Sequence, residues 1–185
     1  MATGSAFRSV YQFGTFVIWP PTKLRAEVNR LRQRYDPASQ AACDAHITLT
    51  QPLLAEPSED DWPEIERVAG SHSPLIIGYG PLDSFLPYPC VYLRIEPPEA
   101  LLALRSDLHA LGLFNLSLPY SEPAEFIPHL SITDGYPDAA QTRQILDALR
   151  GSEPRGSFVA SRIAYIRRDE RFHFSEVRAF ELGGR

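Results

Sequence analysis

Apolar and polar residues follow a strand-then-helix order near the start of the chain. The apolar run from Phe13 to Trp19 predicts a strand, and Leu24, Val28, Leu31 and Tyr35 then recur at the spacing of an amphipathic helix. A Pro-Pro step separates the two patterns, and proline suits the first turn of a helix. The pattern therefore predicts a strand followed directly by a helix.

The same order returns in the middle of the chain. The run from Cys90 to Ile95 predicts a second strand, a second Pro-Pro step follows at Pro97-Pro98, and leucines at helical spacing predict a helix over 101–111. Gly112 then suits the C-terminal cap of this helix. We interpret the return of strand, proline pair and helix as an internal duplication.

Each half continues with a further helix and a further strand. Ser58 and Asp138 are candidate N-caps for helices over 59–70 and 139–150. Three more strands are predicted, Leu75 to Tyr79, Phe158 to Ile166 and Phe174 to Leu182. The sequence therefore predicts an α+β fold built from a duplicated strand-helix-strand-helix-strand unit. Its two pseudo-symmetric lobes should place antiparallel sheets around a central cleft.

The repeats fix the expected domain organisation. We expect a single bilobal domain over 10–185, with repeats over roughly 13–80 and 90–182, after a flexible leader over 1–9. Two proline-rich stretches fit the repeat less well, Gly80 to Pro89 and Asn115 to Pro128. We expect both to be loops near the mouth of the cleft.

One short motif occurs in both halves. His46-Ile47-Thr48-Leu49, the first tetrad, and His129-Leu130-Ser131-Ile132, the second tetrad, both read His, apolar, hydroxyl, apolar. Because side chains alternate along a strand, each tetrad places an imidazole and a hydroxyl on one face and two aliphatic side chains on the other. Two such strands facing each other would bring two histidines and two hydroxyls to one cleft. That set suits acid–base chemistry on a phosphate.

Composition and charge narrow the class of partner. The chain has 185 residues, 44% hydrophobic content and a formal net charge of -5. This charge argues against broad binding along duplex DNA, which needs a basic surface, but permits a small anionic substrate in a locally positive pocket. The two cysteines form no CxxC pair, which favours a reducing, cytoplasmic setting. No apolar run is long enough to span a bilayer, so we expect no membrane partner.

The two tetrads resemble the signature of a known family, the two-histidine (2H) phosphoesterases. This family includes 2′,3′-cyclic nucleotide phosphodiesterases and the bacterial proteins called 2′-5′ RNA ligases. Its signature is a pair of His-x-Thr/Ser-x motifs in a duplicated α+β fold, and an aromatic and Pro-His lead-in such as Phe126-Ile127-Pro128-His129 is typical of the second motif. The order of elements extends the resemblance over most of the chain, roughly Phe13 to Leu182.

The chemistry of the tetrads agrees with that resemblance. Hydrolysis of a cyclic phosphodiester needs a base to activate water and an acid to protonate the departing ribose oxygen, and His46 and His129 can each do either task near neutral pH. The sequence leaves open which is the acid. Thr48 and Ser131 would donate hydrogen bonds to the non-bridging phosphate oxygens. Two histidines plus Asp44 resemble part of a metal-ligand set, but no metal-ligand spacing supports it, and we expect no metal and no cofactor.

Further residues are weaker candidates for substrate binding. Arg167 or Arg168, at the end of a predicted strand, could reach the anion, although a solvated pair would look the same. His173 lies in a turn that can approach the substrate in the family. A base could stack on a loop aromatic, and hinge packing is the alternative for each of Phe85, Tyr120 and Phe172.

The remaining polar residues near the tetrads and on helices have ordinary structural interpretations. We expect His72 at a helix end and His109 on the polar side of its helix. Asp44 could orient the His46 ring, since it points to the same face by parity, although a solvated strand end is an equal alternative. A Cys43–His46 nucleophile is disfavoured because the two residues have opposite parity.

These observations predict a monomeric, metal-independent cyclic phosphodiesterase acting on the 2′,3′-cyclic phosphate of a nucleotide or an RNA end. One alternative is a different ester, either ADP-ribose 1″,2″-cyclic phosphate or a 2′-5′ linkage in RNA. A second is a non-catalytic nucleotide- or RNA-binding module that keeps the cleft, and a third is a repeat that survives only as a relic of the fold. Two titratable groups are not needed for binding alone, so the enzyme is the favoured hypothesis.

Overall fold

Five helices and eight strands follow one another in the part of the chain that the computed structural model describes, residues 10–96, 99–135 and 138–183. The expected leader and the Pro97-Pro98 step lie outside the described residues. In chain order the elements are β1 (Thr15–Ile18), α2 (Thr22–Tyr35), α3 (Pro37–Ala42), β2 (Ile47–Thr48), α4 (Asp61–Ser71), β3 (Leu75–Ser84), β4 (Val91–Glu96), α5 (Glu99–His109), β5 (His129–Ser131), α6 (Ala139–Leu149), β6 (Gly156–Ala160), β7 (Arg162–Arg168) and β8 (Phe174–Glu181).

The predicted α+β order of elements is confirmed. Strand, helix, strand, helix and strand occur as β1, α2, β2, α4 and β3, and again as β4, α5, β5, α6 and β6. The short helix α3 is an addition that the pattern did not predict. It begins after Asp36, whose carboxylate accepts a hydrogen bond from the Ser39 N–H, and proline occupies its first position.

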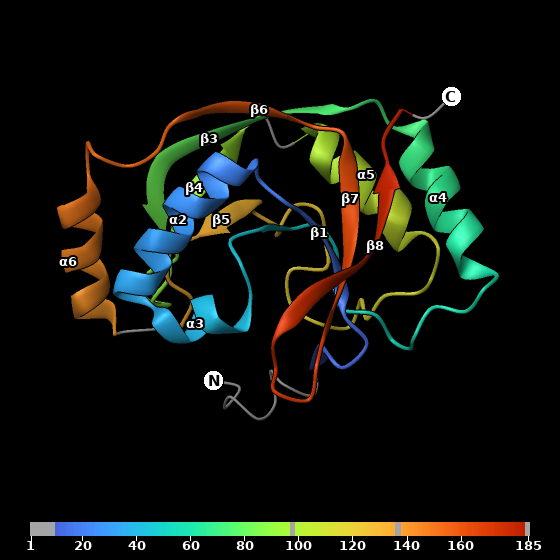
Figure 1. Cartoon of the computed structure of the whole chain (residues 1–185), viewed down its shortest axis with the longest axis horizontal. Coiled ribbons are helices and arrows are strands. Elements are labelled where there is room, and N and C mark those ends of the chain that lie inside the picture. Colours follow the sequence, from blue (N-terminus) through green and yellow to red (C-terminus); the bar gives the residue numbers. More distant parts are fainter. Residues whose placement is uncertain (1–9, 97–98, 136–137, 184–185) are drawn as a thin grey trace.

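All eight strands belong to one antiparallel sheet, in the order β6-β3-β4-β5-β2-β1-β7-β8. The lobes therefore share a single curled sheet (Figure 1) rather than holding one sheet each. Each half of this sheet mixes distant parts of the chain, because β3 of the first repeat pairs with β4 and β6 of the second, and β1 pairs with β7. The two strands of the tetrads, β2 and β5, are neighbours at its centre.

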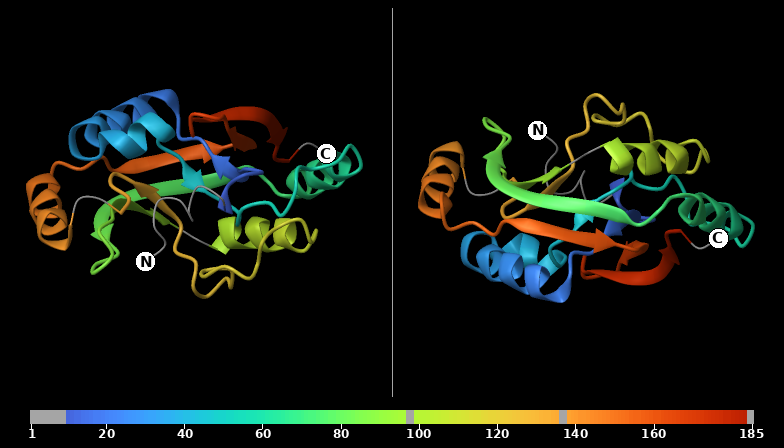
Figure 2. Two further views of the ribbon diagram at one scale, coloured as in Figure 1. Left: turned by 90° about the horizontal axis from the view of Figure 1, so that it is seen from below. Right: turned by 90° about the horizontal axis from the view of Figure 1, so that it is seen from above.

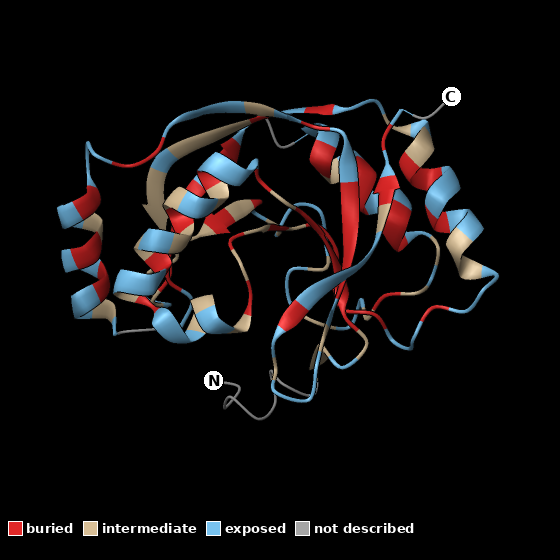
Figure 3. Ribbon diagram, viewed as in Figure 1, coloured by how far each residue is buried: buried red, intermediate tan, exposed pale blue. Residues whose placement is uncertain are grey.

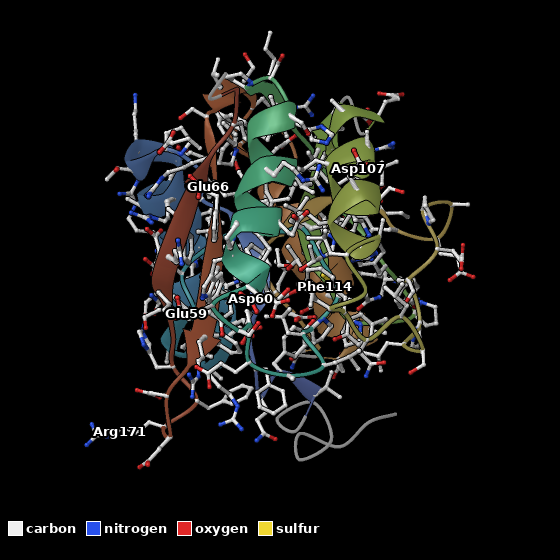
Figure 4. All side chains as sticks on the ribbon, turned by 90° about the vertical axis from the view of Figure 1, so that its right-hand side faces the viewer. Glu59, Asp60, Glu66, Asp107, Phe114 and Arg171 are labelled. Carbon is white, nitrogen blue, oxygen red and sulfur yellow. The ribbon has the colours of Figure 1, made fainter. Side chains whose placement is uncertain are left out.

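The helices repeat the symmetry of the sheet. Figure 2 shows α2 and α5 at diagonally opposite positions, with α6 and α4 at the two ends of the molecule. Beside α5 lies α4 (Figure 4), and the Nε2 of His72 at the end of α4 donates to the Asp107 carboxylate on α5 at 2.9 Å. His72 therefore occupies the helix end that the sequence predicted for it.

The main core lies on the face of the sheet that carries Ile47 and Leu130, both fully buried. Four helices, α2, α4, α5 and α6, contribute buried aliphatic side chains to it, and Figure 3 shows buried positions along the central strands and the inner helix faces. A smaller cluster around Val17, Ala164 and Ile166 lies on the opposite face, since Val17 pairs with Thr48. Burial on both faces encloses β1 and the middle of β7.

Three local predictions were wrong. The strand predicted over Phe158 to Ile166 is two strands, β6 and β7, which pair with β3 and β1 and so belong to different halves of the sheet. Gly80 to Ser84 is not a loop but continues β3, with the register shifting at the Gly80-Pro81 step, where proline is tolerated in a strand. Ser58 does not cap α4, because its own N–H and hydroxyl donate to Asp61.

A buried threonine follows each tetrad and ties it to the neighbouring strand. The Thr50 hydroxyl accepts from the Phe16 N–H at 3.1 Å, and the Thr133 hydroxyl accepts from the Val91 N–H at 3.0 Å. In return, the Phe16 carbonyl accepts from the N–H groups of residues 49 and 50, and the Val91 carbonyl from those of 132 and 133. The duplicated motif is thus five residues long, and its last hydroxyl is structural.

Thr133→Val should lower the free energy of unfolding by about 1–3 kcal/mol, because an isosteric methyl leaves the buried Val91 N–H without its acceptor. Urea denaturation measures the change, and Thr133→Ser, which keeps the hydroxyl, should recover most of it. Thr22→Val, at the exposed start of α2, is the matched control. Equal stability of Thr133→Val and the wild type would contradict a structural role for this hydroxyl.

Candidate active site

The pairing of β2 with β5 brings the two tetrads together. Ile47 lies opposite Leu130 on antiparallel strands. Continuing this register by one residue each way places His46 opposite Ser131 and Thr48 opposite His129, and directly opposed residues have Cβ atoms only about 4.5–5.5 Å apart. All four side chains share the face away from the main core and are partly exposed. Each histidine thus faces the hydroxyl of the other tetrad.

Both imidazole rings are fixed by the same main-chain contact. The Nδ1 of His46 donates to the Asp44 carbonyl at 2.7 Å, and the Nδ1 of His129 donates to the Ile127 carbonyl at 2.7 Å. A carbonyl can only accept, so Nδ1 carries the proton in both rings. Nε2 is therefore the nitrogen that can gain or lose a proton, and it is the same ring nitrogen in both tetrads.

Removal from water lowers the pKa of both histidines. The pKa of His46 falls to about 4, chiefly through burial, and the nearby charges of Arg32 and His129 add to the effect while the bond to the Asp44 carbonyl opposes it. Burial also lowers the pKa of His129, opposed by the bond to its carbonyl partner and by the Asp134 carboxylate. The lowered pKa favours the neutral form of each ring. A bound phosphate would favour protonation of either ring.

Aromatic rings line the site on both sides. The His129 ring lies 4.9 Å from the Phe85 centroid and 5.3 Å from that of Tyr92, and these two rings stack on each other at 4.2 Å. On the other side, the Trp19 ring meets His46 edge-on at 5.9 Å. Phe85 was a sequence candidate, whereas Trp19 and Tyr92 were missed. Both lie on strands or strand ends adjacent to a tetrad, a relation that only the register of the sheet reveals.

The other sequence candidates have partners away from the tetrads. Arg167 forms an ion pair with Glu56, and the Arg168 guanidinium lies over the Phe172 ring at 5.6 Å from its centroid. The His173 N–H donates to the Asp169 carboxylate in the β7–β8 turn, which projects from the body of the molecule in Figure 4 at the labelled Arg171.

Two further candidate aromatics make contacts with residues outside the tetrads. The Phe172 ring packs edge-on against Phe174 at 5.4 Å, within the smaller apolar cluster. The Tyr120 side chain is 65% exposed, and its carbonyl is bound by Arg105. Of the weaker substrate-binding candidates, Phe85 lies against a histidine of the tetrads.

The structure corrects one histidine and resolves two neighbours of His46. His109 is not on the polar side of its helix: it is buried, and its Nε2 accepts from the Gln51 N–H at 3.1 Å. The Asp44 carboxylate accepts from Asn29, so the His46 ring is oriented by the Asp44 carbonyl instead. The Cys43 sulfur lies 3.4 Å from the His46 Nδ1, but burial raises the pKa of its thiol to about 12. A neutral buried thiol is a poor nucleophile.

The described residues offer no evident metal cage and no membrane span. Across 10–96, 99–135 and 138–183, no group of three or more His, Cys, Asp and Glu side chains is arranged to hold a metal ion. No helix in these ranges is long and apolar enough to cross a membrane.

Comparison with solved structures reveals the same fold in proteins of Escherichia coli and Thermus thermophilus. The LigT protein of Escherichia coli, solved in complex with 3′-AMP, superimposes with a TM-score of 0.59 at 17% identity, over 92% of this chain and 97% of that one. A protein of Thermus thermophilus superimposes with a TM-score of 0.57 at 17% identity, over the same shares of the two chains. At this level of identity the likeness establishes the fold.

Sequence comparison identifies the family. A protein of Geobacillus kaustophilus named "Putative phosphoesterase" is 32% identical over 126 residues, 66% of this chain and 69% of the relative. One of the same name from Bacillus licheniformis is 28% identical over 142 residues, 71% of this chain and 79% of the relative. The profile of the 2′-5′ RNA ligase superfamily matches residues 20–171, which include both tetrads. The chain therefore belongs to the 2′-5′ RNA ligase superfamily, the two-histidine phosphoesterases that its paired tetrads resemble.

Proposed function

We propose that this protein is a metal-independent phosphodiesterase that hydrolyses the 2′,3′-cyclic phosphate of a nucleotide or an RNA end. His46 and His129 are its acid–base pair, and Thr48 and Ser131 hold the phosphate. The observation that carries the proposal is the Ile47–Leu130 register, which sets each histidine opposite the hydroxyl of the other tetrad. One phosphate can then lie between two imidazoles and two hydroxyl donors.

The proposed reaction is a single displacement at phosphorus. The Nε2 of one histidine takes a proton from water while the water oxygen forms a bond to phosphorus. The bond between phosphorus and one ribose oxygen breaks, and the Nε2–H of the other histidine gives its proton to that oxygen. The product is a 2′- or 3′-phosphomonoester, and the two histidines end with their protonation states exchanged.

The tetrads supply every group that this step needs. Thr48 and Ser131 donate to the non-bridging oxygens, where negative charge grows in the transition state. The main-chain bonds at Nδ1 hold both rings in the orientation that turns Nε2 to the substrate. Because acid, base and anion donors all come from the chain, we propose that activity needs no metal.

The net charge of the chain favours a small substrate. The net charge of -5 favours a nucleotide or a single RNA end over duplex DNA, and we propose that the protein acts as a monomer on such a substrate. Structures of the E. coli LigT protein hold 3′-AMP, ATP and NADP+. Adenine nucleotides are therefore suitable first probes, with 2′,3′-cyclic AMP as the first substrate.

The rival esters differ from the proposed one only in what surrounds the phosphate. ADP-ribose 1″,2″-cyclic phosphate and a 2′-5′-linked dinucleotide therefore belong in the same substrate panel. Binding of nucleotides without turnover of any of them would favour the non-catalytic binding module instead.

His46→Ala and His129→Ala should each lower kcat for 2′,3′-cyclic AMP on the order of 10²–10⁴-fold, because each removes one partner of the proton transfer. The measurement is phosphomonoester release in EDTA, with folding checked by circular dichroism. His72→Ala, at the C-terminal end of α4, serves as the control and should keep wild-type turnover. Wild-type turnover in either tetrad variant would refute the two-histidine mechanism, and loss of all activity in EDTA would refute metal independence.

Thr48→Val and Ser131→Ala should act on the phosphate rather than on proton transfer. Each removes one donor to a non-bridging oxygen, so kcat should fall on the order of 10²-fold. Thr48→Ser, which keeps the hydroxyl, should remain close to the wild type. Steady-state kinetics on the three variants and the wild type measure the effect. Unchanged kcat and KM in both Thr48→Val and Ser131→Ala would remove these hydroxyls from the mechanism.

The pH profile of kcat/KM should be a bell with its optimum on the acid side of pH 6.5. Burial lowers the pKa of both histidines below that ordinary value. Activity therefore rises with pH as the base loses its proton, and falls again as the acid loses its own. A series of rate measurements from about pH 4 to 9 tests this, and an optimum above about pH 6.5 or a flat profile would contradict the account.

A further inference from the structure

Two arginines are buried behind the tetrads. Arg32 on α2 is 4% exposed and Arg105 on α5 is 2% exposed. Burying a guanidinium is costly unless its N–H groups are paired, and surface arginines of this chain pair with carboxylates. The recorded hydrogen bonds of these two run instead to main-chain carbonyls.

Arg32 joins the second tetrad to the segment before the first through three carbonyls. Its Nη2 donates to Ser39 at 2.8 Å and to Cys43 at 3.0 Å, in the segment that leads into His46. Its Nη1 donates to the carbonyl of Ser131, in the second tetrad, at 3.1 Å. One rigid guanidinium therefore spans the approach to the first tetrad and the second tetrad itself.

Arg105 makes the reciprocal contact from the other repeat. Its Nη1 donates to the carbonyl of Leu49, in the first tetrad, at 2.7 Å, and its Nη2 to that of Tyr120, in the loop before His129, at 2.8 Å. Its guanidinium also lies over the Phe126 ring at 3.9 Å from the centroid. The arginines of α2 and α5 thus each bind a carbonyl in the tetrad of the other repeat. Each also binds a carbonyl in the segment that precedes the tetrad of its own repeat.

The shortness of the tetrad strands explains why these contacts are needed. Only two residues of the first tetrad and three of the second belong to strands. Carbonyls at the ends of such short strands have no N–H donor on a neighbouring strand, and a buried carbonyl without a donor is costly in free energy. With one paired residue between β2 and β5, the ladder itself holds the two tetrads together only weakly.

We propose that Arg32 is a positioning residue of the active site, whose guanidinium sets the separation of the two tetrads by binding the carbonyls of Cys43 and Ser131, with Arg105 as its counterpart from the second repeat. Neither side chain touches the substrate. The expected effect on catalysis rests on the proposed function, because it concerns the distance between the two histidines. The hydrogen bonds from Arg32 to the carbonyls of Cys43 and Ser131, which we call the brace, are a property of the fold.

The charge of Arg32 gives the brace a second, measurable effect. The groups that face His46 are Arg32 from α2, His129 from β5, and Asp44 and Cys43 from its own segment. Around Arg32 lie the further carboxylates of Asp36 and Asp134. The cation disfavours a proton on His46, so removing it should raise the pKa of that ring. A purely structural arginine remote from the site would leave this pKa unchanged.

The test compares Arg32→Met and Arg32→Lys with the wild type and with Arg30→Met, an exposed arginine on the same helix. Hydrolysis of 2′,3′-cyclic AMP gives kcat and KM, and NMR titration of the imidazole protons gives the pKa of His46. Both Arg32 variants should lower kcat on the order of 10- to 100-fold with a smaller change in KM, since small misplacements of reacting groups are costly. Arg32→Met should raise the pKa of His46, and Arg32→Lys should keep it nearer the wild-type value.

The contradicting results are distinct for the brace and for the function. A folded Arg32→Met with wild-type kcat and wild-type His46 titration, or one that loses only thermal stability, would overturn the proposal. If Arg32→Met does not fold, Arg32→Lys decides, and unchanged kcat in it overturns the proposal. If the wild type hydrolyses no cyclic phosphate, the proposed function fails, and only the NMR titration of His46 then tests the role of Arg32. In that case, an equal pKa of His46 in the wild type and in the folded Arg32 variants would overturn the proposal.

Discussion

The site depends on the pairing of two very short strands at the centre of the sheet. β2 and β5 meet through Ile47 and Leu130, both fully buried, and this pair fixes the phase of everything around it. A slip by one residue would turn a histidine and a hydroxyl into the core and two aliphatic side chains onto the partly exposed face. Burial of the aliphatic side chains on one face therefore fixes which side chains lie on the other face. The histidines and hydroxyls on that face stay partly exposed, so placing them there costs little desolvation free energy.

So short a ladder cannot hold that register alone, and the surrounding contacts compensate. The hydroxyls of Thr50 and Thr133 tie each tetrad to its outer neighbour strand. Arg32 and Arg105 each bind a carbonyl of one tetrad and a carbonyl of the segment that precedes the other tetrad. Both kinds of contact occur once in each repeat. The duplication thus repeats the polar supports of the site along with the strands and helices, which explains how a site assembled from two distant segments can be pre-organised.

Much of this arrangement follows from the sequence, because it depends on local periodicity. The strand-helix order, the Asp138 cap of α6 and the two tetrads all have patterns within a few residues. What the sequence could not supply depends on partners far along the chain. The run from Phe158 to Ile166 reads as one strand, and nothing local says that it crosses between two halves of a sheet. Trp19 and Tyr92 read as ordinary strand aromatics until the register places them beside a histidine. Thr50 and Thr133 had a usable signal, since both repeats carry threonine four residues after the histidine.

The central claim is that His46 and His129 face one phosphate. The most direct measurement is an NMR titration of both imidazole resonances with a phosphomonoester product such as 3′-AMP at constant pH. The account predicts that both resonances move toward the protonated form together and report one dissociation constant, because a single anion lies between the two Nε2 atoms. A response from only one histidine, or two responses with different dissociation constants, would contradict it.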